Sequence, residues 1–337
     1  MEALFKMKLN FAIVGCGHIA KKHAEAIKHA EGAELLAVCD TIPENMTPYI
    51  EEYGVQGYED LDDLLKNPDV DVINICTPSG YHAPLAVKAA KAKKHVVVEK
   101  PIALTLEDAQ AIIDACNEND VKLSVVHPNR FRPAIQAIRQ AMDEGRLGKL
   151  SHANATVRWN RNQAYYDQAP WRGTKSLDGG VLMNQAIHNL DLLLWLMGDI
   201  EEVQSMTATR LRKIEAEDVA VGLVRFKNGA LGVIEAATTI YPKNLEETLS
   251  VFGETGSIKI GGVTANKIEH WNVASMDETE VETLVKDIEA DPFGKPGHQC
   301  IIEDMVEAVK ENRTPIVTGE DGKKALELVI KLYEAAE

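Results

Sequence analysis

The chain has 337 residues, of which 45% are hydrophobic and 26% charged, with a net charge of −16 and a pI near 5.1. This profile is typical of a globular protein long enough for two domains, and its acidity argues against nucleic-acid or anionic-membrane binding. Five cysteines occur without a C-x-x-C pair, no stretch reaches membrane-spanning length, and the first residues lack a signal-peptide core. We therefore expect reduced thiols and a cytoplasmic location.

Strand and helix patterns alternate in the first part of the chain. Apolar runs typical of buried strands lie at 9–14, 35–39, 70–76, 95–98 and 122–126. Helical patterns lie at 19–30, 83–93 and 106–117. This alternation predicts a parallel, doubly wound sheet in an α/β domain.

The pattern changes near residue 128, where longer strand candidates begin. These candidates lie at 150–159, 203–211, 219–226, 230–239 and 247–252. Asn228-Gly229, between two of them, is a strong hairpin signal. Helices are expected at 133–144, 181–197, 298–312 and 319–336. The second part is thus predicted to be an α+β domain with a mainly antiparallel sheet.

A glycine-rich loop follows the first predicted strand. Residues 15–20, Gly-Cys-Gly-His-Ile-Ala, fit G-x-G-x-x-A between a strand and a helix, a spacing that lets a pyrophosphate approach backbone N–H groups. Asp40 ends the second strand, where a carboxylate accepts from a ribose hydroxyl and repels a 2′-phosphate, so NAD is favoured over NADP. The alternative is a structural turn, with Asp40 as a surface residue at a helix entry.

Other cofactor contacts are expected at the same edge of the sheet. Thr77 and Pro78 follow the third strand, and His82 lies just beyond them, where packing or helix capping is the favoured role over catalysis. The full set of expected cofactor-binding residues is Gly15, Gly17, His18, Ile19, Asp40, Thr77, Pro78, His82, Glu99, Lys100, Pro101 and Asn129.

Lys100 follows a buried strand within Glu99-Lys100-Pro101. The carboxyl edge of an open parallel sheet is where ligands bind. A lysine placed there can stabilise a developing alkoxide or, if desolvation lowers its pKa, move a proton. The alternative is an exposed lysine paired with Glu99.

A second candidate group lies in the segment 178–191. Asn184 and His188 are four residues apart and share one face of a predicted helix, and His188 can act as an acid or base near neutral pH. The alternative is a histidine whose hydrogen bonds are satisfied in an amphipathic helix. Asparagine is a poor ligand for transition metals, so no metal is expected.

Together the glycine loop, Glu99-Lys100-Pro101 and the Gly-Gly segment that ends at His188 and Asp191 resemble the Gfo/Idh/MocA oxidoreductases. The resemblance implies a Rossmann domain over 1–127 and, over 128–337, a substrate-binding domain whose open sheet often forms an oligomer interface. It also implies that Lys100 and His188 are catalytic. Many members carry aspartate where this chain has Asn184. Because an amide takes no proton, Asn184 is expected to orient His188 or the substrate.

Arginines and aromatic residues cluster between 158 and 172, with three arginines and two of the four tryptophans. Arginine suits carboxylate and phosphate, and aromatic rings suit sugar or base faces. The alternative is a docked loop with solvated arginines. The expected substrate-binding residues are Lys100, Arg130, Arg158, Tyr165, Tyr166, Trp171, Arg172, Asn184 and His188.

Within the family, 129–131, 171–174 and 184–188 are similar to the WlbA/WbpB group of UDP-N-acetyl-D-glucosaminuronate 3-dehydrogenases. That resemblance implies NAD-dependent oxidation of a sugar 3-hydroxyl in surface-polysaccharide biosynthesis. It further implies a UDP-sugar substrate, 2-oxoglutarate as an oxidant that recycles the cofactor, and a homotetramer. Two alternatives stay open: an inositol or other sugar dehydrogenase of the same family, and a non-catalytic NAD-sensing regulator.

Overall fold

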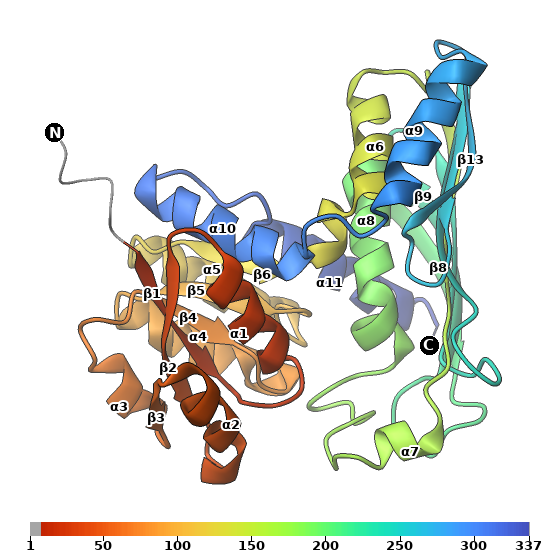
Figure 1. The fold of residues 1–337 in the computed structure, drawn as a ribbon. Coiled ribbons are helices and arrows are strands. Elements are labelled where there is room, and N and C mark those ends of the chain that lie inside the picture. The colour runs from red at the N-terminus through yellow and green to blue at the C-terminus, as the bar shows by residue number, and fades with distance from the viewer. Residues whose placement is uncertain (1–7, 337) are drawn as a thin grey trace, which may run out of the picture. The chain divides into compact units, whose positions relative to one another are not determined.

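The computed structural model describes residues 8–336, which form two compact units (Figure 1). The first contains the chain up to Pro128 together with Pro296–Lys323, and the second contains Asn129–Lys295 together with the chain from Lys324 onward. The sequence predicts a cofactor-binding domain over 1–127 and a substrate-binding domain over 128–337. This assignment of functions stays a prediction.

The first unit contains a six-stranded parallel sheet in the order β3-β2-β1-β4-β5-β6. Its strands are β1 (Leu9–Val14), β2 (Ala33–Cys39), β3 (Gln56–Tyr58), β4 (Val72–Ile75), β5 (His95–Glu99) and β6 (Leu123–Val126). The order reverses between β1 and β4, and in such sheets the crevice at the carboxyl ends of these strands receives a dinucleotide. The predicted parallel sheet is confirmed.

Helices pack in pairs within this unit: α1 beside α10, and α4 beside α5. The helices are α1 (Ala20–His29), α2 (Pro43–Tyr53), α3 (Leu61–Leu65), α4 (His82–Lys91), α5 (Leu106–Glu118) and α10 (Gly297–Lys310). α2 and α3 were not anticipated. Pro43 starts α2, and the side chain of Asp60 caps α3 by accepting from Asp62 N and Asp63 N, which are local signals at helix starts.

The second unit contains a seven-stranded sheet in the order β13-β12-β11-β7-β10-β9-β8. Its strands are β7 (Leu150–Arg158), β8 (Ile200–Ala208), β9 (Val219–Phe226), β10 (Leu231–Ala237), β11 (Glu246–Gly253), β12 (Gly256–Gly261) and β13 (Lys267–Val273). Only the β7–β10 pair is parallel, so the mainly antiparallel sheet is confirmed. The predicted β9–β10 hairpin turns at Gly229, whose φ of +85° suits glycine.

Helices cover one face of this sheet, as Figure 1 shows for α6 (Pro133–Asp143) and α8 (Ile187–Met197). Ala153, Ala155 and Val157 of β7 are buried, and α8 packs against β7 and β11. Side chains alternate between the faces of a strand, so the neighbouring residues of β7 lie on the other face. The remaining helices are α7 (Gln163–Tyr166), α9 (Glu278–Ala290) and α11 (Gly319–Glu334).

The other face carries exposed apolar side chains on three neighbouring strands. They are Met206 of β8, Val221 and Leu223 of β9, and Leu231 and Val233 of β10. Cross-strand pairing places Met206 opposite Val221 and Leu223 opposite Val233, so these side chains lie together. We call this set the outer apolar patch.

The structure also bears on the state of the cysteines and on membrane-spanning segments. Cys16, Cys39, Cys76 and Cys116 are buried thiols outside any disulfide, as expected. Burial raises the pKa of Cys16 to about 12, so this thiol in the glycine loop is unreactive. Among residues 8–336, no helix has the length and apolar character needed to cross a membrane.

Candidate active site

The glycine loop joins β1 to α1 at the switch point of the parallel sheet. Gly15 has a φ of +90°, and a Cβ there would lie 2.8 Å from the backbone nitrogen of Thr77, so no other residue fits. A Cβ on Gly17 would meet nothing within 4 Å. No side chain caps the first turn of α1. Open space beside uncapped N–H groups is what a pyrophosphate requires, and the loop fits a dinucleotide.

Asp40 fastens this loop to the end of β2. Its carboxylate accepts from the backbone N–H of Cys16 at 2.7 Å and of Ile42 at 2.9 Å, and from Asn45 Nδ2 at 3.2 Å. The carboxylate is therefore held where the glycine loop meets β2. That Asp40 also accepts from a ribose hydroxyl stays a prediction, as do the contacts predicted for His18 and Ile19.

His82 connects the loops that follow β4 and β5. Its ring is buried, with Nδ1 2.8 Å from the carbonyl oxygen of Pro101 and Nε2 3.0 Å from that of Thr77. Burial lowers the pKa of this histidine. These contacts match the favoured packing role, because both ring nitrogens are turned to the backbone.

Lys100 is distinguished from its neighbours by its exposure. In the run 96–103 every residue is buried except Lys100, which is partly exposed at the carboxyl end of β5. The cofactor contact predicted for Glu99 stays a prediction. The buried carboxylate of Glu99 lies 2.9 Å from His23 Nε2, within the unit. Lys100 is thus the one side chain of this loop that reaches the surface.

Asn184 and His188 stand out in the same way in the second unit. In the run 178–193 every residue is buried except these two, which are partly exposed. Asn184 lies on a π-helical turn, Leu182–Ala186, and His188 lies in the first turn of α8, which follows it directly. π-turns are rare and frequently mark functional sites, because one extra residue shifts the side chains that follow. Both candidates therefore face outward from an otherwise buried helix.

Asp178 fixes the orientation of Asn184, a role that sequence reasoning missed. Its buried carboxylate accepts from the backbone N–H of Gly173 at 2.7 Å and from Asn184 Nδ2. With the nitrogen of the amide directed to Asp178, the oxygen is directed away from it. The only available signal was the Asp-Gly-Gly turn six residues earlier.

Glu217 supports the π-helical turn from below. Its Oε1 accepts from Leu182 N at 2.9 Å and from the Tyr333 hydroxyl at 3.0 Å. A Cβ on Gly180 would lie 2.0 Å from Oε2 of Glu217, so the second glycine of the pair leaves room for this carboxylate. Burial raises the pKa of Glu217. These contacts come from residues distant in sequence and carry no local signal.

The arginine and aromatic cluster forms a continuous stack in the second unit. The guanidinium of Arg161 lies 5.0 Å from the ring centre of Trp159 and 5.3 Å from that of Tyr165. Arg172 lies 4.4 Å from Tyr165 and 4.6 Å from Trp171. Its Nη1 donates to the Tyr165 hydroxyl at 2.6 Å, while its buried Nε has no hydrogen-bond partner. A buried donor without an acceptor suits a site completed by an anionic ligand.

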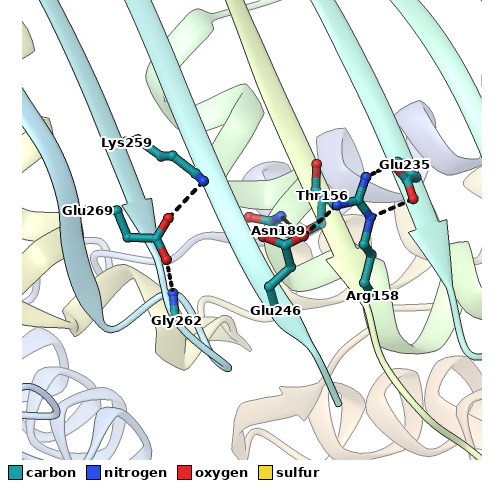
Figure 2. A network of polar contacts seen from close by, with 8 residues as sticks. All are labelled: Thr156, Arg158, Asn189, Glu235, Glu246, Lys259, Gly262 and Glu269. Atoms are coloured by element: carbon teal, nitrogen blue, oxygen red, sulfur yellow. Dashed lines mark hydrogen bonds and ion pairs between the residues drawn. The ribbon is translucent and has the colours of Figure 1, made fainter. Parts of the chain in front are cut away.

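Arg158, predicted to bind substrate, lies elsewhere. It belongs to the face of β7 opposite Val157, the face away from α8, and ion pairs occupy its guanidinium (Figure 2). Nε donates to Glu235 at 2.7 Å and Nη1 to Glu246 at 2.5 Å, and these hydrogen bonds raise its pKa. These ion pairs do not favour a substrate role for Arg158, which stays a prediction. Figure 2 also shows Asn189 of α8 donating to the carbonyl oxygen of Thr156 on β7.

Three further predicted ligands are held inside the second unit. Arg130 is buried and donates to both carboxylate oxygens of Asp191, at 2.8 and 2.6 Å. Tyr166 is buried, with its hydroxyl 3.2 Å from Thr238 Oγ1. Asn129 is buried and donates to Glu247 at 3.2 Å. Their polar groups bind protein partners, and their ligand roles stay predictions.

The fold and the glycine loop define an NAD-binding oxidoreductase with a Rossmann domain. Residues 9–127 match the model of the oxidoreductase family with an NAD-binding Rossmann fold, and residues 135–259 match that of the Gfo/Idh/MocA C-terminal domain. The chain belongs to the Gfo/Idh/MocA family of oxidoreductases. The predicted family, fold and cofactor are confirmed.

Solved structures and characterised relatives differ in what they act on. The WlbA dehydrogenase of Bordetella pertussis, solved with NADH and UDP-GlcNAcA, is 37% identical, has a TM-score of 0.93, and aligns over 98% of this chain and 96% of its own. That of Chromobacterium violaceum, solved with the same ligands, is 40% identical, has a TM-score of 0.92, and aligns over 98% and 94%. The myo-inositol 2-dehydrogenase of Thermotoga maritima is 30% identical over 94% of this chain and 93% of its own.

Proposed function

We propose that this protein oxidises the 3-hydroxyl of a UDP-N-acetylglucosaminuronic acid with NAD, in surface-polysaccharide sugar biosynthesis. The stack of Arg161 and Arg172 with Trp159, Tyr165 and Trp171 carries the proposal. A UDP-uronate has two phosphates, a carboxylate and stackable rings, which such a cluster is suited to bind. The two WlbA structures with UDP-GlcNAcA, at 37% and 40% identity, support the same substrate.

In the proposed reaction, the alcohol loses a hydride from carbon and a proton from oxygen. Bound NAD supplies the hydride acceptor for the hydrogen on C3, and the hydroxyl proton passes to a protein base as the ketone forms. We assign the proton to Lys100 and His188, the partly exposed titratable residues of their respective runs. The protonated group stabilises the developing alkoxide. Asn184, held by Asp178, orients the sugar or His188 through its amide oxygen.

The proposed substrate ligands follow from these contacts. Arg172 offers its unpartnered Nε to a phosphate or to the uronate carboxylate, and Arg161 offers a second guanidinium in the same stack. Tyr165 and Trp171 present rings to the sugar or the base. Of the predicted ligands, these contacts favour Lys100, Tyr165, Trp171, Arg172, Asn184 and His188, and we add Arg161 to them.

A second candidate within the family is oxidation of myo-inositol or a simple sugar. The Thermotoga maritima relative, at 30% identity, favours it. A small polyol has no anionic groups for the arginines to bind. Activity on such a substrate would therefore survive loss of Arg172. A non-catalytic NAD-sensing role is less favoured, because it requires neither Lys100 nor His188.

We further propose a homo-oligomer, with a tetramer as the expected form. The outer apolar patch supports an interface of this kind, because exposed apolar side chains on neighbouring strands mark association surfaces. Recycling of reduced cofactor by 2-oxoglutarate is part of the proposal and rests on the resemblance alone.

Turnover with product analysis tests the proposed substrate. The purified protein is incubated with UDP-GlcNAcA and NAD+, and the products are followed by NADH absorbance and mass spectrometry. The proposal predicts NADH and a nucleotide sugar two mass units lighter. No turnover and no binding of this sugar would refute it.

A further inference from the structure

Glu99, the residue before Lys100, has a buried carboxylate surrounded by three N–H groups. Oε1 lies 2.9 Å from His23 Nε2 and 3.4 Å from His298 Nε2, and Oε2 accepts from the backbone N–H of Lys100 at 3.2 Å. The carboxylate is about as buried as a core residue, with Glu99 5% and His23 1% exposed. His298 comes from α10, about two hundred residues later in the chain, within the same unit.

The neighbouring amide sets the direction of these hydrogen bonds. Asn74 Nδ2 lies 2.9 Å from His23 Nδ1, and an amide N–H donates to an unprotonated ring nitrogen. The proton of His23 is therefore on Nε2, which donates to Glu99. Burial raises the pKa of Glu99, but hydrogen bonds and charges from His23 and His298 outweigh it and hold the pKa well below its usual range. Glu99 is thus an ionised acceptor of three N–H groups.

We propose that Glu99, held by His23 and His298, is a positioning residue for Lys100. The inference rests on the proposed function, in which Lys100 contacts the substrate. Because Glu99 accepts from the Lys100 backbone N–H, the carboxylate fixes the start of the loop from which the lysine side chain extends. It also places a permanent negative charge one residue from the ammonium group. His298 can take part because α10 belongs to the first unit, where it packs against α1 and β6.

A metal ion is the competing explanation for these three side chains. In residues 8–336 they form the one group of His, Cys, Asp and Glu that is compact enough, with ligand atoms within 4.8 Å of one another. Metal ligation requires an unprotonated Nε2 on both histidines. Asn74 gives His23 the opposite tautomer, so hydrogen bonding to a carboxylate is the assignment that fits.

The pH dependence of His298 variants tests the proposal with a matched rescue. The titratable groups around Glu99 are His23 and Lys22 of α1, Cys76 after β4, His82 of α4, Lys100 and His298. His298→Phe removes one donor, so the pKa of Glu99 rises. We expect kcat for UDP-GlcNAcA to fall about tenfold, with a loss between pH 7 and pH 5 that is larger than the loss of the wild type over the same range.

Rescue and control variants separate positioning from general damage. His298→Gln restores an N–H near the position of Nε2, and we expect it to recover most of kcat and the pH profile of the wild type. His29→Phe, an exposed histidine on α1, is the control and should match the wild type. The KM for NAD+ should stay within about twofold in all three. Equal kcat profiles for His298→Phe and the wild type would overturn the proposal.

A measurement without substrate keeps this proposal separate from the proposed function. Trace acetylation with acetic anhydride, read by peptide mass spectrometry at pH 6–11, gives the midpoint at which the amine of Lys100 becomes reactive. Glu99→Gln removes the neighbouring charge, so the midpoint should move to lower pH, while Lys91 in the same sample should not change. An unchanged Lys100 midpoint, or about one metal ion per chain lost in His23→Phe, would overturn the proposal even if the UDP-sugar is oxidised.

Discussion

Asn184 donates its side-chain N–H to the buried carboxylate of Asp178, which also accepts from the backbone of Gly173. The amide is therefore held in one orientation, with its oxygen directed away from Asp178. Asn184 carries no carboxylate of its own, and the carboxylate that it contacts belongs to the buried Asp178. The pair accounts for how a residue that takes no proton can still orient a substrate or His188.

Removing the Asp178 carboxylate should release this orientation. Asp178→Ala leaves Asn184 Nδ2 and Gly173 N–H without their acceptor, so the amide is free to turn. We expect kcat to fall about 10- to 100-fold with a smaller change in KM, measured by NADH formation under saturating NAD+. Asp167→Ala, an exposed residue in the same part of the chain, is the control. Wild-type kcat in Asp178→Ala would contradict the positioning role.

Lys100 and His188 should separate catalysis from cofactor binding. Lys100→Met and His188→Leu each remove a group proposed to hold the hydroxyl proton, so kcat should fall about 10²- to 10⁴-fold. NADH affinity, followed by fluorescence titration, should change less than about threefold, because the glycine loop and Asp40 are intact. A variant of either residue that retains wild-type kcat would remove that residue from the proton path.

Two arginines of the same cluster should behave differently. Arg172→Ala removes a guanidinium that stacks on Tyr165 and whose Nε has no hydrogen-bond partner in the protein. Because this donor is proposed to bind an anionic group of the substrate, the KM for UDP-GlcNAcA should rise at least tenfold. Arg158→Ala breaks only ion pairs on the far face of the sheet, and KM should stay within about twofold. The comparison is made by initial rates at varied sugar concentration. A larger effect at Arg158 than at Arg172 would contradict this assignment and support a substrate role for Arg158.

The outer apolar patch should control assembly. Leu223 is 55% exposed and lies opposite Val233 of β10, two residues from Val221, which pairs with Met206 of β8. Leu223→Glu puts a charge where an apolar contact is proposed, so sedimentation velocity should show a smaller species than the wild type. Glu201→Lys, an exposed change on β8, is the control. An unchanged mass for Leu223→Glu would place the interface elsewhere.

Glu247 should make stability depend on pH in the second unit. Burial raises its pKa to about 7, although Arg132 and Asn129 act in the opposite direction. A carboxyl with a raised folded-state pKa binds more protons folded than unfolded, so stability falls as the pH rises from about 4.5 to about 7. Glu247→Gln should remove up to about 3 kcal/mol of this fall. Urea unfolding at pH 5 and 8 gives the free energy of unfolding of both proteins. An equal change in this free energy between the two pH values for the wild type and Glu247→Gln would contradict the prediction.

Local signals were sufficient for the regular parts of the fold. The β-branched runs of β4 and β5 and the glycine loop predicted the parallel sheet, and Asn228-Gly229 predicted the β9–β10 hairpin. β12 and β13 were missed, since their apolar residues are few. The return of α10 to the first unit depends on packing against α1, which no local pattern encodes.

The candidate site could be proposed from the sequence where burial and chemistry coincide. Lys100 and His188 were selected because a charged or titratable residue interrupts an apolar run, and both are partly exposed within buried runs. The ion pairs of Arg130 and Arg158 were not anticipated, because a sequence does not show which carboxylates lie opposite a guanidinium. Asp191 and Glu235 come from other elements, at distances of 61 and 77 residues along the chain. Asp178 and Glu217 were missed for the same reason.

The specificity of the purified wild-type enzyme tests the central claim most directly. Measured with NAD+ under one set of conditions, kcat/KM for UDP-GlcNAcA should exceed that for myo-inositol by at least about 10³-fold, because only the nucleotide sugar engages Arg161 and Arg172. A kcat/KM for myo-inositol equal to or above that for UDP-GlcNAcA would contradict the account.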